Sequence, residues 1–167
     1  AVLFIFWPGA TITGPFPQTL AKWDELLSRR KTAAIAGTDA HGNTYSIGPL
    51  RRAVLPYEHC FRALRNHVLS PVAFSGTLEH DRGLIYRALK HGRSFIAYDA
   101  LGDATGFSFQ ATDGHFVAGI GEELRLSGEV TLEVSSPLVA HLRLLHHPFE
   151  EIDIRPARRR QDHLEPA

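Results

Sequence analysis

Residues 32–42 have the sequence TAAIAGTDAHG. The apolar run over 32–36 predicts a short buried strand, which Gly37 ends. Asp39 and His41 follow at once, and in extended backbone two residues at this spacing point the same way. A converging carboxylate and imidazole can bind a divalent transition metal, or act as a base and its orienting partner. The alternative is a solvated turn in which Asp39 caps the loop.

The segment before this stretch predicts a helix over residues 19–30. Leu20, Trp23, Leu26 and Leu27 recur at helical spacing, and Thr19 is a suitable N-cap. A helix that leads into a strand is the α→β unit from which parallel sheets and barrels are built. We therefore expect Asp39 and His41 at the C-terminal rim of a barrel or sheet.

The segment after it predicts a rim loop over residues 42–56 with a short strand at 53–55. Helical spacing of apolar residues predicts one helix over 57–68 and another over 81–91, which Asp81 caps and Gly92 ends.

After Gly92 the pattern changes to short strands separated by Gly and Pro turns, which indicates an antiparallel sandwich or sheet. Within it, the alternation over 130–134 predicts burial of Val130, Leu132 and Val134. The expected strands lie at 95–98, 106–111, 124–126, 130–134, 141–145 and 152–154. We divide the chain into residues 1–93, a β-rich unit over 94–155 and a polar tail over 156–167.

Composition narrows the function classes. The 167 residues include 18 basic and 18 acidic side chains, and this balance argues against a protein that mainly binds nucleic acid. Cys60 is the single cysteine, so an internal disulfide and a thiolate metal cluster are excluded, and we expect it in the core. The apolar run Val2–Trp7 is too short to span a bilayer. With no Met in the chain, that run suggests a fragment of a larger domain.

Several other polar residues are weaker candidates. His59 and His67 lie eight apart on the predicted helix and could share a face. The adjacent pair His146-His147 chelates poorly on a strand, because neighbouring side chains face opposite ways. His115 is expected in a solvated turn, and the basic pair Arg51-Arg52 could hold a phosphate but is more simply solvated.

The residues 34–41, AIAGTDAH, resemble the last metal-binding motif of the PHP (polymerase and histidinol phosphatase) family, usually written Gly-Ser-Asp-Ala-His. In that family a Trp-Asp pair on a helix often precedes the motif, as Trp23-Asp24 does here. The order of the downstream segments is similar to that of PHP-type phosphoesterases with a C-terminal β extension; these segments are Pro56-Tyr57-Glu58, Phe61-Arg62, residues 85–93 and Gly106-Phe107. The resemblance covers residues 18–147, and its sharpest part is Asp39-Ala40-His41.

The resemblance implies an α/β fold in which residues 1–93 are the C-terminal part of a distorted (β/α)7 barrel, followed by a β-sandwich-like unit. It implies that Asp39 and His41 are ligands to zinc, manganese or iron in a site of two or three metals. The implied reaction is hydrolysis of a phosphorylated small molecule by metal-activated water.

The chain departs from the family in one large respect: it contains no His-x-His, the first metal motif of PHP domains. Two ligands are too few for a tight catalytic site, so we expect no phosphatase activity from this chain alone. The alternative is a non-catalytic, truncated relative whose β unit serves binding or association. Exposed apolar edges would then favour self-association. The neutral charge and the β extension disfavour a polymerase-associated proofreading module.

Overall fold

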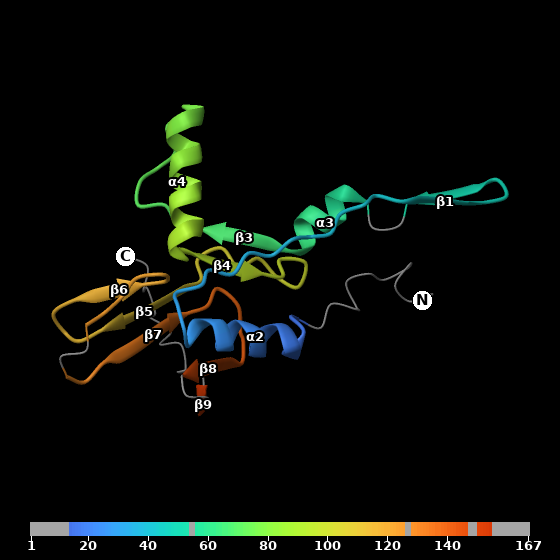
Figure 1. Ribbon diagram of the computed structural model, residues 1–167. Helices are drawn as coiled ribbons and strands as arrows, with labels where there is room; N and C mark the ends of the chain where they lie inside the picture. The colour runs from blue at the N-terminus through green and yellow to red at the C-terminus, as the bar shows by residue number, and fades with distance from the viewer. Residues whose placement is uncertain (1–13, 54–55, 126–127, 147–149, 155–167) are drawn as a thin grey trace, which may run out of the picture.

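The computed structural model describes residues 14–53, 56–125, 128–146 and 150–154 (Figure 1). These residues form helices and antiparallel sheets, so the chain is mixed α and β. No barrel closes within the described part of the chain, where the sheets have two or three strands each. The predicted run Val2–Trp7 and the polar tail lie outside the described residues.

The first described helix, α2, spans Pro17–Leu27. It begins two residues before the predicted cap Thr19, because Pro17 has no N–H to satisfy and its fixed φ suits the first helical turn. The prediction that Thr19 caps it was wrong, since Phe16 occupies the N-cap position. The Trp23 indole Nε1 donates to the Thr32 carbonyl at 3.0 Å, which ties the helix to the segment that follows.

Residues 57–68 do not form one helix, and that prediction was wrong. Helix α3 spans Tyr57–Ala63 and is followed directly by strand β3, Arg65–Val68. Strand β3 pairs antiparallel with β4, Ser94–Ala97, in the register Arg65↔Ala97 to Val68↔Ser94.

Helix α4 spans Leu78–His91 and ends at Gly92, whose left-handed φ of 69° confirms the predicted stop. Leu84 and Ala88 are its buried residues. Asp81 lies inside the helix, so its prediction as N-cap was wrong. Its carboxylate instead accepts the backbone N–H groups of Ser75 and Gly76, each at 2.9 Å, and these bonds lower the pKa of Asp81.

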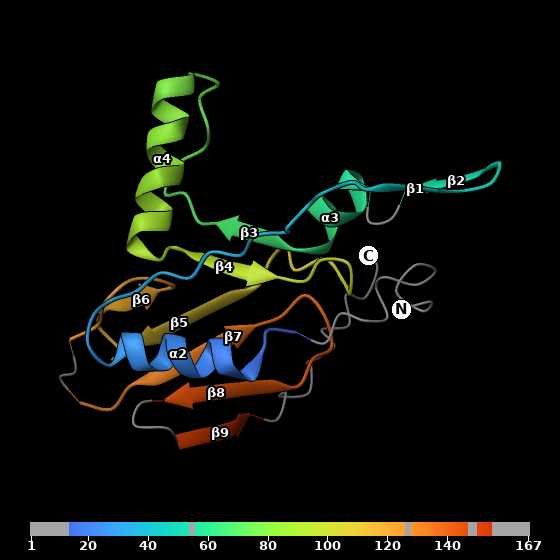
Figure 2. The same cartoon turned by 45° about the vertical axis from the view of Figure 1, so that its right-hand side comes forward.

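The predicted rim loop contains a hairpin. Strands β1, Thr44–Ile47, and β2, Leu50–Ala53, pair antiparallel around Gly48-Pro49, so the prediction of a loop was wrong here. This hairpin and α4 both extend away from the other elements (Figure 2).

The β-rich part is confirmed as antiparallel. Its three-stranded sheet has the order β6-β5-β7, and β8 pairs with β9. The bounds are β5 Ser108–Thr112, β6 Val117–Gly119, β7 Thr131–Ser135, β8 Leu142–His146 and β9 Glu150–Ile154. Leu124 and Arg125, which were predicted to lie in a strand over 124–126, have no regular secondary structure, and residue 126 lies outside the described residues. The predicted burial of Val130, Leu132 and Val134 was wrong, since Val130 and Val134 are half-buried and Leu132 is 41% exposed.

The core of the described residues is small. The buried apolar side chains are Cys60, Leu84, Ala88, Ala97 and Ala118, which confirms the core placement of Cys60. Four of the five are small residues, so the described chain buries little apolar surface per element. In the part of the chain that the structure describes, no helix has the length and apolar character needed to cross a membrane.

One close backbone crossing joins two distant parts of the sequence. Gly121, after β6, has a φ of +79° and packs on the Gly92–Arg93 peptide. Lys31 Nζ donates to the Gly121 carbonyl at 2.6 Å, and Arg93 pairs with Glu122 at 3.2 Å. Helix α4, the segment after α2 and the β5–β6 hairpin therefore meet at this crossing.

Candidate functional site

The segment from Lys31 to Asn43 carries Asp39 and His41 and has no regular secondary structure. The predicted buried strand over 32–36 was therefore wrong, and Ile35 is 63% exposed. The backbone of Ala36 is held by a side chain instead. Its N–H donates to Asn66 Oδ1 at 2.9 Å, and its carbonyl accepts from Asn66 Nδ2 at 2.8 Å. The planar carboxamide of Asn66, on β3, thus makes the two backbone hydrogen bonds that a residue of a neighbouring strand would otherwise make.

Asp39 and His41 lie side by side, but not through extended backbone. Asp39 has a φ of +48°, the left-handed region that few non-glycine residues adopt. The turn at Asp39 brings its carbonyl oxygen to 2.6 Å from His41 Nδ1, and its carboxylate Oδ1 lies 3.7 Å from the same nitrogen. Both side chains are exposed to solvent.

The end of this loop is seated on α3. The Tyr57 hydroxyl donates to the His41 carbonyl at 3.1 Å. A Cβ atom at Gly42 would lie 2.6 Å from Tyr57 Cε2, so the Tyr57 ring closely approaches the Gly42 backbone. The Asp39–His41 turn is thus held at Ala36 on one side and at His41 and Gly42 on the other.

The two side chains are of the types that ligate divalent metals. The Asp39 carbonyl can only accept, so the hydrogen bond to His41 requires the proton on Nδ1. The neutral ring then has its lone pair on Nε2, and a histidine ligand commonly donates its other N–H to a carbonyl in this way. No group of three or more His, Cys, Asp or Glu side chains that could hold a metal ion comes together within the described residues. Asp39 and His41 therefore supply two donors, half of a tetrahedral set.

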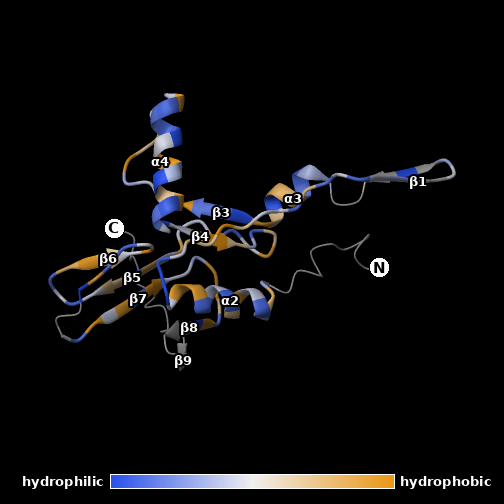
Figure 3. Cartoon of the chain, in the orientation of Figure 1, coloured by the Kyte–Doolittle hydropathy of each residue, from blue (hydrophilic) through white to orange (hydrophobic). Residues whose placement is uncertain are grey.

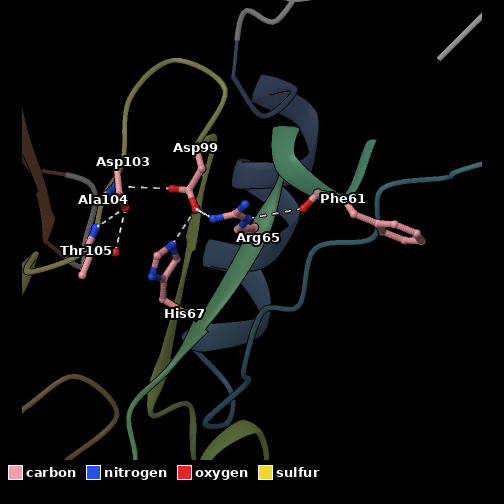
Figure 4. Close-up of polar contacts among 7 residues, drawn as sticks. All are labelled: Phe61, Arg65, His67, Asp99, Asp103, Ala104 and Thr105. Carbon is pink, nitrogen blue, oxygen red and sulfur yellow. Dashed lines mark hydrogen bonds and ion pairs between the residues drawn. The ribbon is translucent and has the colours of Figure 1, made fainter. Parts of the chain in front are cut away.

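A second polar cluster forms around Asp99, in the loop after β4 (Figure 4). The Asp99 side chain is only 4% exposed. Its Oδ2 accepts from His67 Nε2 at 2.9 Å and from an Arg65 guanidinium nitrogen at 3.3 Å. Its Oδ1 accepts the Ala104 backbone N–H at 3.4 Å. A buried carboxylate with these partners is satisfied internally and joins β3 to the loop after β4.

His67 packs as part of the same region. Its ring is stacked on Phe95 of β4, with centroids 4.7 Å apart, and Phe95 in turn contacts Phe107 at 5.1 Å. His67 was expected on one helix with His59; it lies on β3, and His59 lies on α3. The partner that gives His67 a role, Asp99, is 32 residues away in sequence, and no local pattern marks it.

A cleft of about 680 Å³ lies beside this cluster. Its lining contains three carboxylates against two arginines, so it does not favour a phosphate. One of these carboxylates, Asp103, is kept ionised because the Thr105 hydroxyl and then its backbone N–H hold the pKa of Asp103 below its ordinary value. The lining residues are Pro56, Glu58, His59, Arg62, Arg65, Asp99, Ala100 and Asp103.

The other residues that the sequence suggested for a site do not lie together in the described structure. His115 is exposed in the turn between β5 and β6, as predicted. The side chains of Arg52 and His146 and the whole of His147 lie outside the described structure. Asn66 and Tyr57 were not predicted as site residues, since a single Asn on a strand and a Tyr on an amphipathic helix carry no distinctive signal.

Comparisons of the chain with protein-family models, curated proteins and solved structures give no match. The PHP resemblance therefore stays a prediction that Asp39-Ala40-His41 carries.

Proposed function

We propose that this chain is part of a metal-dependent phosphoesterase, in which Asp39 and His41 supply two ligands to a divalent metal such as zinc, manganese or iron. The observation that carries the proposal is the paired donor geometry. The Asp39 carboxylate and the His41 imidazole share one turn, with Asp39 Oδ1 3.7 Å from His41 Nδ1. The Asp39 carbonyl binds that same nitrogen, which leaves Nε2 as the ring nitrogen that could ligate a metal.

The chain's own residues have limited parts in this reaction. Asp39 offers a carboxylate, and the Asp39 carbonyl keeps the His41 proton on Nδ1 so that Nε2 can ligate. A bound metal would polarise a phosphoryl oxygen and lower the pKa of a bound water. The substrate class proposed is a phosphorylated small molecule. Because two donors make an incomplete set, we expect weak metal binding and no turnover by these 167 residues.

A titration with Mn²⁺ followed by NMR tests the proposal, because the ion's paramagnetism broadens resonances near its site even when binding is weak. We expect the resonances of residues 38–42 to broaden first, and the double variant Asp39→Asn, His41→Gln to remove this preference. The chain offers a matched control in Asp113-Gly114-His115, a second Asp-x-His, in which Asp113 is half-buried and His115 exposed. There the Asp113 carboxylate already accepts backbone N–H groups from His115 and Phe116.

Equal broadening at both Asp-x-His sequences would contradict the proposed metal site. In the same samples, hydrolysis of a phosphate monoester should not exceed that of buffer with Mn²⁺. Clear turnover would overturn the expectation that the ligand set is incomplete.

A second function, association through the apolar surface, is favoured by the exposed area. Large apolar side chains are exposed on α4, where Leu78 is 74% and Tyr86 65% exposed. The loop that leads into α4 also carries apolar residues (Figure 3). A surface of this kind is expected to be covered by another polypeptide.

Light scattering over a range of protein concentrations tests this second function. We expect a weight-average mass above 18.5 kDa that rises with concentration, and a smaller rise for Leu78→Lys than for the wild type. A monomeric mass at all concentrations would argue against association.

A further inference from the structure

The loop that carries Asp39 and His41 is fixed without any strand pairing of its own. Its first fixed point is the pair of hydrogen bonds between Asn66 and Ala36, at 2.9 and 2.8 Å, which are partly buried. One carboxamide supplies both the donor and the acceptor that a single peptide unit needs. Aspartate at this position would lose the donor and place a carboxylate against the Ala36 carbonyl.

The second fixed point is Tyr57. Its hydroxyl binds the His41 carbonyl and its ring lies against Gly42, while Phe61 stacks on the same ring with centroids 6.1 Å apart. Both fixed points come from elements that follow the loop in sequence, α3 and β3.

Between these two points the backbone holds an unfavourable conformation. Among the described residues, Asp39 is the only non-glycine residue whose φ is positive. A left-handed conformation is unfavourable for an L-residue, although Asp tolerates it better than most. Such a conformation persists where its surroundings determine it, and here those surroundings are the bonds at Ala36 and His41.

We propose that Asn66 and Tyr57 are positioning residues that hold the Asp39–His41 turn in the geometry that pairs the carboxylate with the imidazole. This inference rests on the metal-binding function proposed above. The advantage of a fixed turn is that metal binding need not order the loop, so less binding energy is lost to conformational entropy.

The test uses the full chain with Asn66→Asp and Tyr57→Phe, each of which removes hydrogen bonding with little change of shape. Tyr45→Phe, at an exposed neighbouring position, is the matched control for both readouts, and Asn43→Asp is the matched control for the readout without metal. The first readout needs no metal: hydrogen exchange of the Ala36 amide and the Cα shift of Asp39. The new carboxylate can still accept the Ala36 N–H, but it loses the bond to the Ala36 carbonyl and repels that oxygen. We therefore expect Asn66→Asp to loosen the pair and speed Ala36 exchange severalfold, and the controls to leave it unchanged.

The second readout is the Mn²⁺ dissociation constant at residues 38–42, measured by NMR. We expect it to rise severalfold in both variants, while broadening at Asp113 and His115 and the urea midpoint change little. This pattern separates positioning from a general loss of stability. If the Asn66→Asp variant does not fold, the same measurements on Tyr57→Phe still test whether the turn is held in place.

The outcomes distinguish the two claims. If wild-type protein binds Mn²⁺ at Asp39 and His41 but both variants match their controls in exchange, shifts and affinity, the positioning role is overturned and the metal site stands. If the wild type shows no preference for this turn, the metal function fails. In that case a rise in Ala36 exchange and a changed Asp39 shift would still support the positioning role, and their absence would overturn it.

Discussion

Gly121→Ala is expected to lower the free energy of unfolding by about 3 kcal/mol. Two effects add at this position. The φ of +79° is strained for any residue with a Cβ, and a methyl group would meet the Gly92 carbonyl carbon, its oxygen at 2.5 Å and Arg93 N at 2.6 Å. The atoms that it meets are backbone, so no side-chain rotation can relieve the clash. Urea denaturation of the two proteins measures the difference.

Two other glycines separate these effects. Gly114 has a φ of +88° with open space around it, so Gly114→Ala should cost about 1 kcal/mol through strain alone. Gly128 has neither a positive φ nor a neighbour within 4 Å, and Gly128→Ala should change stability by less than about 0.5 kcal/mol. Equal losses for Gly121→Ala and Gly114→Ala would contradict the close crossing of Gly121 and Gly92.

Asp99→Ala is expected to destabilise the protein by about 2–3 kcal/mol. The substitution leaves His67, Arg65 and the Ala104 N–H without their acceptor, and it opens a space where the carboxylate was buried. Arg65 is 47% exposed and can turn to water, so the estimate is below the cost of a fully buried pair. Urea denaturation at pH 7, in low and high salt, measures the loss.

Glu79→Ala is the matched control, because it removes an exposed partner of Arg82 on α4. Exposed pairs of this kind contribute about 0.5 kcal/mol or less and are screened by salt. The loss from Asp99→Ala should persist at 1 M salt, since screening hardly reaches a buried pair. A loss as small as that of Glu79→Ala would show that the Asp99 cluster contributes nothing specific.

The elements with strong local signals could be predicted from the sequence. Helix α4 has a clear apolar face and a glycine at its end, and β7 and β8 alternate between short turns. The misses have a physical cause. The spacing of Tyr57, Phe61, Leu64 and Val68 continues past Ala63, although the helix ends there, because pairing of β3 with β4 outweighs helix propensity.

Elements without burial were also missed. The β1–β2 hairpin extends from the other elements, and the side chains of Thr44, Tyr45 and Ser46 are exposed, so no hydrophobic pattern marks it. The segment over 32–36 is the opposite case, because a strand was predicted and none is present. Its apolar run predicted the strand, but the Asn66 side chain makes the hydrogen bonds to the Ala36 backbone instead.

In the candidate site, too, features set by neighbouring residues could be predicted, and features set by distant residues could not. Asp39 and His41 could be selected because their spacing is local. Their geometry could not be predicted, because it depends on a positive φ and on contacts from Tyr57 and Asn66, 16 or more residues away. The metal role itself stays a prediction.

The pairing of β3 with β4 limits how far the polypeptide can be shortened for laboratory work. These strands flank α4, and a cut after Arg93 would remove Ile96, which pairs with Asn66. A version kept to study Asp39 and His41 must therefore extend at least to Ala97. It must reach Ala104 if the Asp99 bonds are to remain. A useful shortened product thus combines the Asp39–His41 turn with sequence as far as Ala104.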